Sequence, residues 1–161
     1  MPNRWRRITN GRDASSPSVS DHKRRWLILG NPQNRRVKLF QGALRASGQQ
    51  RAAVVSYVDF LRGKVELAPL LERLAQKRGI FRIESPGEDF EVERLLIARG
   101  APVTSDIAAA SAMRLRSDPG RVRYPRQWLA GFHHALDEIK TQLQLLPGLA
   151  SLDSCEWPGR P

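Results

Sequence analysis

Three short segments in the first half of the chain have the pattern of buried strands. They cover residues 26–29, 52–56 and 80–84, and each is apolar for most of its length rather than alternating between apolar and polar positions. Continuous apolar runs of this length are typical of parallel strands that are covered on both faces. Turn residues follow the first strand at 30–32 and the third at 85–87, so a sharp turn is expected at both places.

A stretch with apolar residues at helical spacing follows each strand. The first predicted helix begins at Asn34, a typical N-cap residue, and ends at Gly48; the second ends at Gly79 and the third at Gly100. The apolar positions are Val37, Phe40 and Leu44 in the first helix, Leu67, Leu70, Leu71 and Leu74 in the second, and Val92, Leu95 and Leu96 in the third. This order predicts parallel pairing through right-handed crossovers. Residues 26–99 are therefore expected to form a three-layer α/β unit, half of a Rossmann-like domain.

The pattern after Gly100 predicts two further helices. A short one is expected to be capped at Ser105, and a long one to begin at Pro125, since proline is favoured at the first helical position. The apolar positions of the long helix are three or four residues apart: Leu129, Phe132, Leu136, Ile139, Leu143 and Leu146. Such a narrow seam needs a partner surface, so residues 129–146 are a candidate contact with another polypeptide or with a second copy of the chain.

Composition sets the limits of the domain. A chain of 161 residues suits a single domain, which we expect to span residues 26–146. Residues 1–25 hold seven Lys or Arg and two Asp, a net charge of 7 − 2 = +5, together with a serine-rich stretch that lacks apolar periodicity. We expect this segment to be a disordered basic tail, and residues 147–161 to be an irregular tail.

Several classes of protein are disfavoured by the sequence. No apolar run approaches the roughly 18 residues of a membrane span and no export leader is apparent, so we expect a cytoplasmic protein. The single cysteine, Cys155, has no partner for an internal disulfide. His133 and His134 are neighbours that face different directions on the long helix, so no metal site is predicted. The sequence contains neither a Gly-x-Gly-x-x-Gly motif nor a Walker lysine, so a nucleotide site is not predicted.

The turn after the first strand is one candidate binding site, because ligands of parallel sheets bind outside the carboxyl ends of the strands. The turns expected at that edge are residues 30–34, 56–59 and 85–89. The first contains Asn31 and Asn34, and Arg35 and Arg36 follow in the first turn of a helix, where the helix dipole disfavours cations. A bound phosphate or carboxylate would offset that cost. The alternative is that both arginines are solvated or pair with acids elsewhere.

The turn after the third strand is acidic. Ser85, Glu88 and Asp89 lie in it, and Glu91 and Glu93 follow in the next helix. Acids complement the positive end of a helix dipole and Asp89 can cap the helix, so a purely structural role accounts for them. The alternative is a bound substrate amine or magnesium ion, with the proline and glycine of the turn aiming Glu88 or Asp89 inward.

Four segments of the chain resemble a known family. They are Gly-Asn-Pro-Gln-Asn-Arg-Arg-Val at 30–37, Val-Val-Ser-Tyr at 54–57, Arg-Ile-Glu-Ser-Pro-Gly-Glu-Asp-Phe-Glu-Val-Glu-Arg at 82–94 and Tyr-Pro-Arg-Gln-Trp at 124–128. Together they are similar to the amino-terminal region of a group of bacterial ATP-grasp-like proteins, over about residues 26–146. The segment at 82–94 is the most distinctive of the four.

The resemblance implies a Rossmann-like domain that precedes the lobes of an ATP-grasp enzyme and helps to hold the acceptor substrate. Such enzymes join a carboxylate to an amine or thiol through an acylphosphate, and their lobes bind ATP and magnesium. Those lobes do not fit into 161 residues, so the resemblance implies neither a complete catalytic site nor a cofactor bound by this chain alone. It favours a stand-alone or truncated pre-ATP-grasp domain that binds a small acidic or amino-acid-like ligand, beside a separate ATP-grasp polypeptide. The expected ligand-binding residues are Asn31, Asn34, Arg35, Arg36, Ser85, Glu88, Asp89 and Arg126.

Two other functions remain open. The net charge of +11 and the basic tail favour a weakly binding nucleic-acid module, since Lys and Arg bind phosphates regardless of base sequence. The third alternative is a small enzyme that uses the acidic turn, although no His, Cys or Lys accompanies those acids in the sequence.

Overall fold

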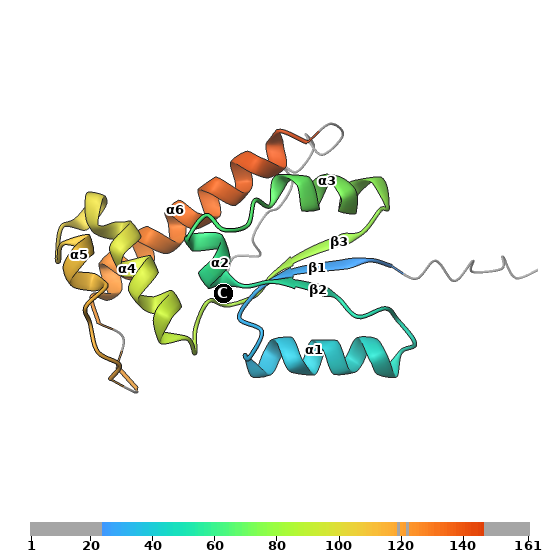
Figure 1. Ribbon diagram of the computed structural model, residues 1–161, viewed down its shortest axis with the longest axis horizontal. Coiled ribbons are helices and arrows are strands. Elements are labelled where there is room, and N and C mark those ends of the chain that lie inside the picture. Colours follow the sequence, from blue (N-terminus) through green and yellow to red (C-terminus); the bar gives the residue numbers. More distant parts are fainter. Residues whose placement is uncertain (1–23, 119, 122, 147–161) are drawn as a thin grey trace, which may run out of the picture.

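The sheet has three parallel strands with β1 in the middle. The computed structural model describes residues 24–118, 120–121 and 123–146. Its strands are β1 (Trp26–Leu29), β2 (Ala53–Val55) and β3 (Ile80–Ile83), in the order β2-β1-β3 (Figure 1). Both outer strands pair in parallel with β1, which confirms the three-strand parallel sheet predicted from the sequence.

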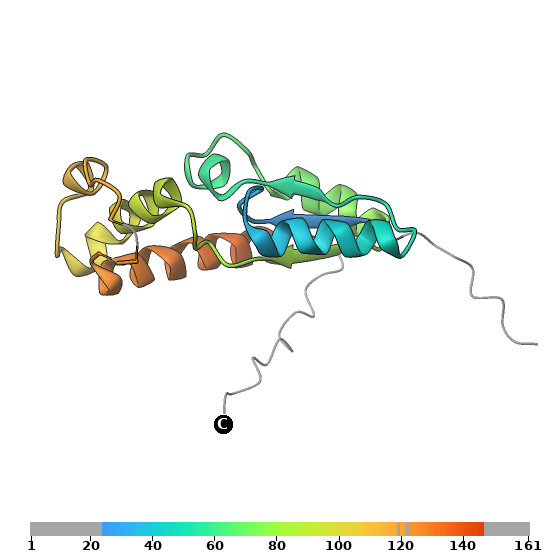
Figure 2. The ribbon, with the colours of Figure 1, turned by 90° about the horizontal axis from the view of Figure 1, so that it is seen from below.

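Helices cover both faces of the sheet. α1 (Arg35–Ala46) lies on one face, and α2 (Tyr57–Leu61), α3 (Ala68–Gln76) and α6 (Pro125–Gln144) lie on the other (Figure 1 and Figure 2). The strand order explains this arrangement. The chain crosses from β1 to β2 in one direction and from β2 past β1 to β3 in the other, and right-handed crossovers in opposite directions place their helices on opposite faces. The three-layer α/β fold expected from the sequence is therefore confirmed.

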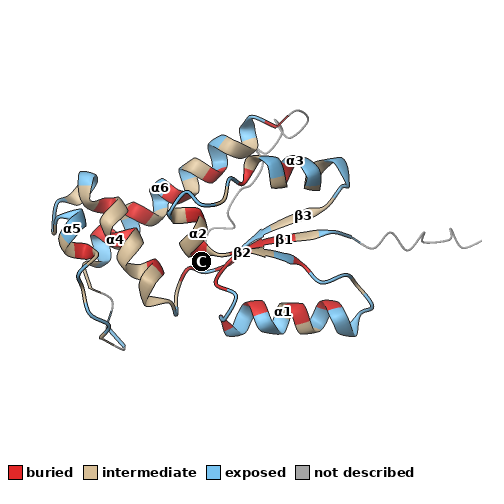
Figure 3. Ribbon diagram, in the orientation of Figure 1, coloured by how far each residue is buried: buried red, intermediate tan, exposed pale blue. Residues whose placement is uncertain are grey.

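The side chains of β1 divide the core into two clusters. Ile28 packs with Val37 and Leu44 of α1, whereas Leu27 and Leu29 pack with the helices on the other face. All five residues are buried, and the buried residues of α1 lie on the side of the helix that faces the sheet (Figure 3). Successive side chains of a strand point to opposite faces, so a strand that contributes to two cores has to be apolar throughout.

α4 (Phe90–Thr104) and α6 cross at two glycines. A Cβ atom on Gly100 would lie 1.9 Å from the carbonyl oxygen of Gln127, and a Cβ atom on Gly131 would lie 1.9 Å from that of Leu96. The prediction that Gly100 ends its helix is wrong, because α4 continues beyond this residue. Gly100 allows the two helix backbones to approach closely and does not act as a helix stop.

The segment after α4 also differs from the prediction. Ser105, the expected N-cap of a new helix, is the C-cap of α4 and has a left-handed backbone with φ of 56°. Its amide donates a hydrogen bond to the carbonyl oxygen of Ala101 at 3.1 Å, which satisfies one of the free carbonyls at the helix end. The short helix is α5 (Ala109–Ala112), and its N-cap, Ala108, forms no side-chain cap.

α2 is a helix that the apolar pattern did not predict. Its residues were expected to form part of a turn at 56–59, but Ser56 caps a helix of five residues, and its hydroxyl oxygen accepts a hydrogen bond from the amide of Asp59 at 3.0 Å. Tyr57 and Phe60 of this helix are buried in the larger core cluster. A single helical turn is too short to show periodicity, so the sequence pattern could not separate it from a turn.

α6 begins at Pro125, as predicted, and packs along α4. Its buried positions are four residues apart and include small and polar residues: Gln127, Gly131, Ala135 and Ile139. The larger apolar residues Phe132 and Leu136 of the predicted seam are partly buried beside this row, whereas Leu129 is 46% exposed. α4 of the same chain therefore provides a partner surface for this helix.

Parts of the predicted tails lie outside the described residues. They are residues 1–23 of the basic tail and residues 147–161 at the other end of the chain. In the part of the chain that the structure describes, no helix combines the length and the apolar character needed to cross a membrane.

Candidate functional site

The turns after β1 and β3 touch each other at the carboxyl edge of the sheet. The side-chain amide of Asn31 donates hydrogen bonds to the carbonyl oxygens of Pro86 at 3.0 Å and of Gly87 at 3.1 Å. Asn31 is only 3% exposed; its bond to Pro86 is buried and its bond to Gly87 is partly buried. Parallel strands end at the same edge of a sheet, which is why turns far apart in the sequence meet here. We call residues 30–36 and 84–89 the rim.

Asn34 links the same two turns and also begins α1. Its Oδ1 atom accepts a hydrogen bond from the amide of Arg36 at 2.7 Å, which is the N-cap interaction predicted for it. Its Nδ2 atom lies 3.5 Å from the carbonyl oxygen of Gly87, and its own amide donates to the carbonyl oxygen of Asn31 at 2.9 Å. The two asparagines therefore fix the turn after β1 against the turn after β3.

One polar atom at this junction has no partner. Asn31 Oδ1 is buried and accepts no hydrogen bond from the described residues. The orientation of the amide group is determined by its two bonds from Nδ2, because the carbonyl oxygens that it contacts can only accept. A buried acceptor without a partner costs about 1–3 kcal/mol. A buried water molecule, or the ammonium, hydroxyl or amide group of a ligand, would remove that cost on reaching this atom.

Arg35 and Arg36 extend from the first turn of α1. Both side chains are exposed, and neither forms an ion pair with the part of the chain that the structure describes. The first turn of α1 contains no acidic residue. The two guanidinium groups and the positive end of the helix dipole therefore produce a positive potential beside Asn31, which suits a carboxylate or a phosphate.

Two acids at the start of α4, Asp89 and Glu91, are engaged in structural contacts. Asp89 caps α4, as predicted, because its Oδ1 atom accepts hydrogen bonds from the amides of Glu91 at 2.9 Å and Val92 at 3.3 Å. Glu91 forms ion pairs with Arg62 and Arg94, and thereby joins α2 to α4. The structural interpretation accounts for both residues without a ligand.

Ser85 and Glu88 shape the turn itself. The hydroxyl oxygen of Ser85 accepts a hydrogen bond from the amide of Gly87 at 3.3 Å. Glu88 has a left-handed backbone, with φ of 66°, and its side chain is exposed. Its carboxylate is therefore accessible at the rim, whereas Asp89 and Glu91 hold the helix.

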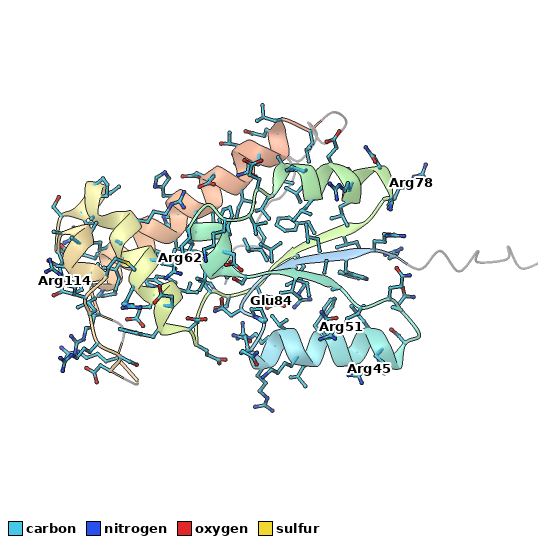
Figure 4. The ribbon with its side chains drawn as sticks, viewed as in Figure 1. Arg45, Arg51, Arg62, Arg78, Glu84 and Arg114 are labelled. Atoms are coloured by element: carbon cyan, nitrogen blue, oxygen red, sulfur yellow. The ribbon has the colours of Figure 1, made fainter. Side chains whose placement is uncertain are left out.

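The reasoning from sequence missed Glu84, a carboxylate only 6% exposed at the end of β3 (Figure 4). Its carboxylate pairs with the guanidinium group of Arg82, which also lies 4.5 Å from the ring centroid of Phe40. Gly30 leaves room for it, since a Cβ atom there would lie 3.1 Å from the Cβ of Glu84. The available signal was an acid directly after an apolar strand, although the burial of its side chain depends on the turn after β1, where Gly30 lies against its Cβ.

Tyr57 connects the ends of β2 and β3, and it was also missed. Its hydroxyl donates a hydrogen bond to the backbone carbonyl oxygen of Glu84 at 2.7 Å, and the side chain is fully buried. Burial, with a smaller contribution from the charge of Glu84, raises the pKa of Tyr57 far above its ordinary value of 10.0. The phenol therefore stays protonated and remains a donor at the edge of the sheet.

Arg126 is the predicted site residue that the structure does not bring to the rim. It is exposed on the first turn of α6, next to the crossing with Gly100. Gly100 lies 11 residues after Asp89 along α4, which corresponds to about 16 Å of helix. The other seven predicted residues, Asn31, Asn34, Arg35, Arg36, Ser85, Glu88 and Asp89, all belong to the two turns that meet.

The rim has the chemistry of a binding site for a ligand of mixed charge. Arg35, Arg36 and the start of α1 provide the cationic side, while Asn31 Oδ1 and the exposed carboxylate of Glu88 provide acceptors. Among the residues described, no three His, Cys, Asp or Glu side chains are grouped so that they could hold a metal ion.

Comparisons with known proteins give no match: no family model, no curated protein and no solved structure matches this chain. Fold and rim therefore define its class, an α/β protein whose three parallel strands end at a polar rim and whose longest helix packs along α4. The likeness to ATP-grasp-like proteins depends on the four sequence segments alone.

Proposed function

We propose that the rim binds a small ligand that carries both an anionic group and a hydrogen-bond donor, as an amino acid does. One observation carries this proposal: the buried, unpaired Asn31 Oδ1 atom lies in the turn that leads into α1. A helix N-terminus attracts an anion, and an unpaired buried acceptor attracts a donor. A ligand with both groups satisfies both features at once.

Different residues bind the two ends of the ligand in this proposal. Arg35 and Arg36 bind the carboxylate, since their guanidinium groups are exposed and unpaired within the described residues. The donor end contacts Asn31, and the exposed carboxylate of Glu88 supplies negative charge for an ammonium group, since the carboxylate of Glu84 is already paired with Arg82. Asn34, Ser85 and Asp89 keep the turns in shape through the hydrogen bonds described above.

The resemblance to ATP-grasp-like proteins extends the proposal to a larger assembly. In this assembly the chain is a pre-ATP-grasp-type domain that presents its ligand to ATP-grasp lobes on a separate polypeptide, as one component of a carboxylate–amine ligase. ATP and magnesium are then bound by those lobes. The exposed Leu129 and Leu145 of the 129–146 segment, 46% and 76% exposed, are candidate contacts with that partner or with a second copy of the chain.

Isothermal titration calorimetry of the full chain against the amino acids, with inorganic phosphate and ATP as further titrants, tests the binding step. We expect at least one amino acid to bind to the wild type and the Arg35→Ala and Arg36→Ala variants to weaken that binding by about 10- to 150-fold each, the worth of a hydrogen bond to a charged group. Arg116→Ala is the matched control, because Arg116 is exposed and lies outside the rim.

Two results would contradict the proposal. The first is the absence of heat with every amino acid for the wild type. The second is binding that all three variants retain with equal affinity, because the arginines of the rim would then not contact the ligand.

A further inference from the structure

Charge is distributed unevenly along the chain. Between Asp21 and Asp59 the sequence contains no acidic residue, while the described part of this stretch carries seven cations: Arg24, Arg25, Arg35, Arg36, Lys38, Arg45 and Arg51. The stretch forms β1, α1 and β2. The half of the sheet that contains β1 and β2, together with α1, is therefore strongly basic.

A groove of about 740 Å³ runs between α1 and β2. Lys38 and Arg45 of α1 line it together with Arg51, which precedes β2. Lys38 and Arg45 are seven residues apart, about two turns or 10 Å along the helix. The lining residues of this groove include three cations and no Asp or Glu.

A second groove, of about 340 Å³, lies between the start of β2 and α3. Arg25, Arg73 and Lys77 line it, and Arg51 belongs to both grooves. This groove also has no acidic residue in its lining. Because Arg51 is shared, the two grooves meet at the amino end of β2.

The cations of the two grooves form one surface, which we call the basic edge. It consists of Arg25, Lys38, Arg45, Arg51, Arg73 and Lys77. All six are exposed, and none is paired with an acid in residues 24–146 as far as they are described. Figure 4 shows Arg45 and Arg51 close together, in the half of the molecule that also carries Arg78, whereas Arg62 and Arg114 lie in the other half.

The side chain of Gln41 argues against a peptide strand as the occupant of this surface. Its Nε2 atom donates to the carbonyl oxygen of Ala52 at 2.9 Å, and its Oε1 atom accepts from the amide of Ala52 at 3.0 Å. Ala52 comes directly before β2, so these are backbone groups that an added strand would need. Gln41 is 8% exposed and occupies them from within the protein.

A polyanion needs only the cations, which remain free. We propose that the basic edge binds the phosphate backbone of a nucleic acid, without reading its base sequence. Four of the six cations are arginines, whose guanidinium groups bind phosphate oxygens in pairs. Two grooves that meet at Arg51 offer successive phosphates a continuous row of contacts, whereas a flat lipid surface could not enter them.

Fluorescence anisotropy with a labelled 20-nucleotide single strand, RNA or DNA, tests this proposal on the full chain over a series of salt concentrations. One triple variant, Lys38→Ala, Arg45→Ala and Arg51→Ala, removes three cations of the first groove. A second triple variant removes three exposed cations elsewhere: Lys64, Arg116 and Lys140, each replaced by alanine. Both variants lose the same charge, so they differ only in where that charge was.

We expect the first triple variant to bind at least tenfold more weakly at low salt than the wild type. The slope of log K against log salt should fall by about 2, because each phosphate of a single strand that a cation no longer neutralises changes it by about 0.7. The second triple variant should stay within about twofold of the wild type. Melting temperatures of all three proteins check that the variants are folded.

Three results would overturn the proposal. An equal loss of affinity in the two triple variants would show a general effect of net charge. An absence of binding by the wild type would show that the basic edge does not bind nucleic acid. Tighter binding to vesicles with anionic lipids than to the nucleic acid, lost in the first triple variant, would make the surface a lipid contact. Amino-acid binding at the rim uses Arg35 and Arg36 and is measured separately, so the two proposals can fail independently.

Discussion

Gly100 and Gly131 face each other where α4 crosses α6, and neither position has room for a Cβ atom. A Cβ atom on Gly100 would lie 2.9 Å from the amide nitrogen of Gly131, and one on Gly131 would lie 2.9 Å from that of Gly100. The nearest obstacles are carbonyl oxygens of the opposite helix, at 1.9 Å in each case. Backbone atoms cannot move aside as a flexible side chain can, so the crossing depends on both glycines.

Gly131→Ala should reduce the free energy of unfolding by about 3 kcal/mol, the upper end of the cost of overpacking a core, because the added methyl group separates α4 from α6. Gly42→Ala is the matched control. A Cβ atom on Gly42, in the middle of α1, would meet nothing within 4 Å, and alanine there should stabilise the protein by about 0.5–1 kcal/mol. Urea unfolding followed by circular dichroism measures both changes. Equal effects of the two substitutions would contradict the packing described.

Asn31→Ala should cost about 1–3 kcal/mol of folding stability, because it leaves the buried carbonyl oxygen of Pro86 and the partly buried one of Gly87 without their donor, and this loss outweighs the removal of the unpaired Oδ1 atom. Gln33→Ala, in the same turn but exposed, should change stability by less than about 0.5 kcal/mol. Thermal unfolding of both variants measures the difference. If Asn31→Ala were as stable as Gln33→Ala, the two turns would not depend on this contact.

Tyr57→Phe should lower stability by about 1 kcal/mol near pH 8, through loss of the hydrogen bond to the carbonyl oxygen of Glu84. The difference should shrink as the pH rises above 10. The pKa of Tyr57 is raised in the folded protein, so above pH 10 unfolding releases a proton from the wild type, which then loses up to about 1.4 kcal/mol of stability per pH unit. Tyr57→Phe has no phenol at this position and therefore does not lose stability in this way.

Urea unfolding of the wild type and Tyr57→Phe at pH 8, 9, 10 and 11 checks the pH dependence. Groups that both proteins share cancel in the difference between the two curves. A difference that stays constant across this range would mean that the phenol of Tyr57 titrates alike in the folded and unfolded states.

Gln41→Ala should destabilise the protein by about 1–3 kcal/mol, because both backbone groups of Ala52 lose their partner in a buried place. It should also increase self-association, since backbone groups at a sheet edge are then free to pair with another chain. Gln76→Ala, exposed at the end of α3, is the control. Denaturation and light scattering at several protein concentrations measure the two effects. If Gln41→Ala changed neither the stability nor the self-association of the protein, Gln41 would not protect the backbone groups of Ala52.

Local rules were sufficient for much of the fold. The apolar run at 26–29 predicted β1 because a strand with helices on both faces has no exposed side, and Asn34 and Asp89 were recognised as caps because a cap depends on residues two or three positions away. The meeting of the turns after β1 and β3 followed from parallel pairing alone.

Features that depend on distant contacts were not predictable in this way. Gly100 looked like a helix stop, since its role is set by α6, which lies more than 20 residues further along the chain. Glu84 looked like an ordinary polar residue at a strand end, and only the packing of the turn after β1 against its Cβ shows that it is buried. The two turns of the predicted site meet as expected, Arg126 lies away from them, and Glu84 was not among the predicted residues; the ligand-binding role of all these residues stays a prediction.

The contact between Gln41 and Ala52 makes the two outer strands of the sheet unequal. Just before β2 a side chain of the protein itself already bonds the backbone groups of Ala52 that a neighbouring strand would use, whereas no such contact is found along β3 among the described residues. Any lengthening of this sheet by a further parallel strand, from this or another polypeptide, would therefore be directed to β3 and would produce the order 2-1-3-4.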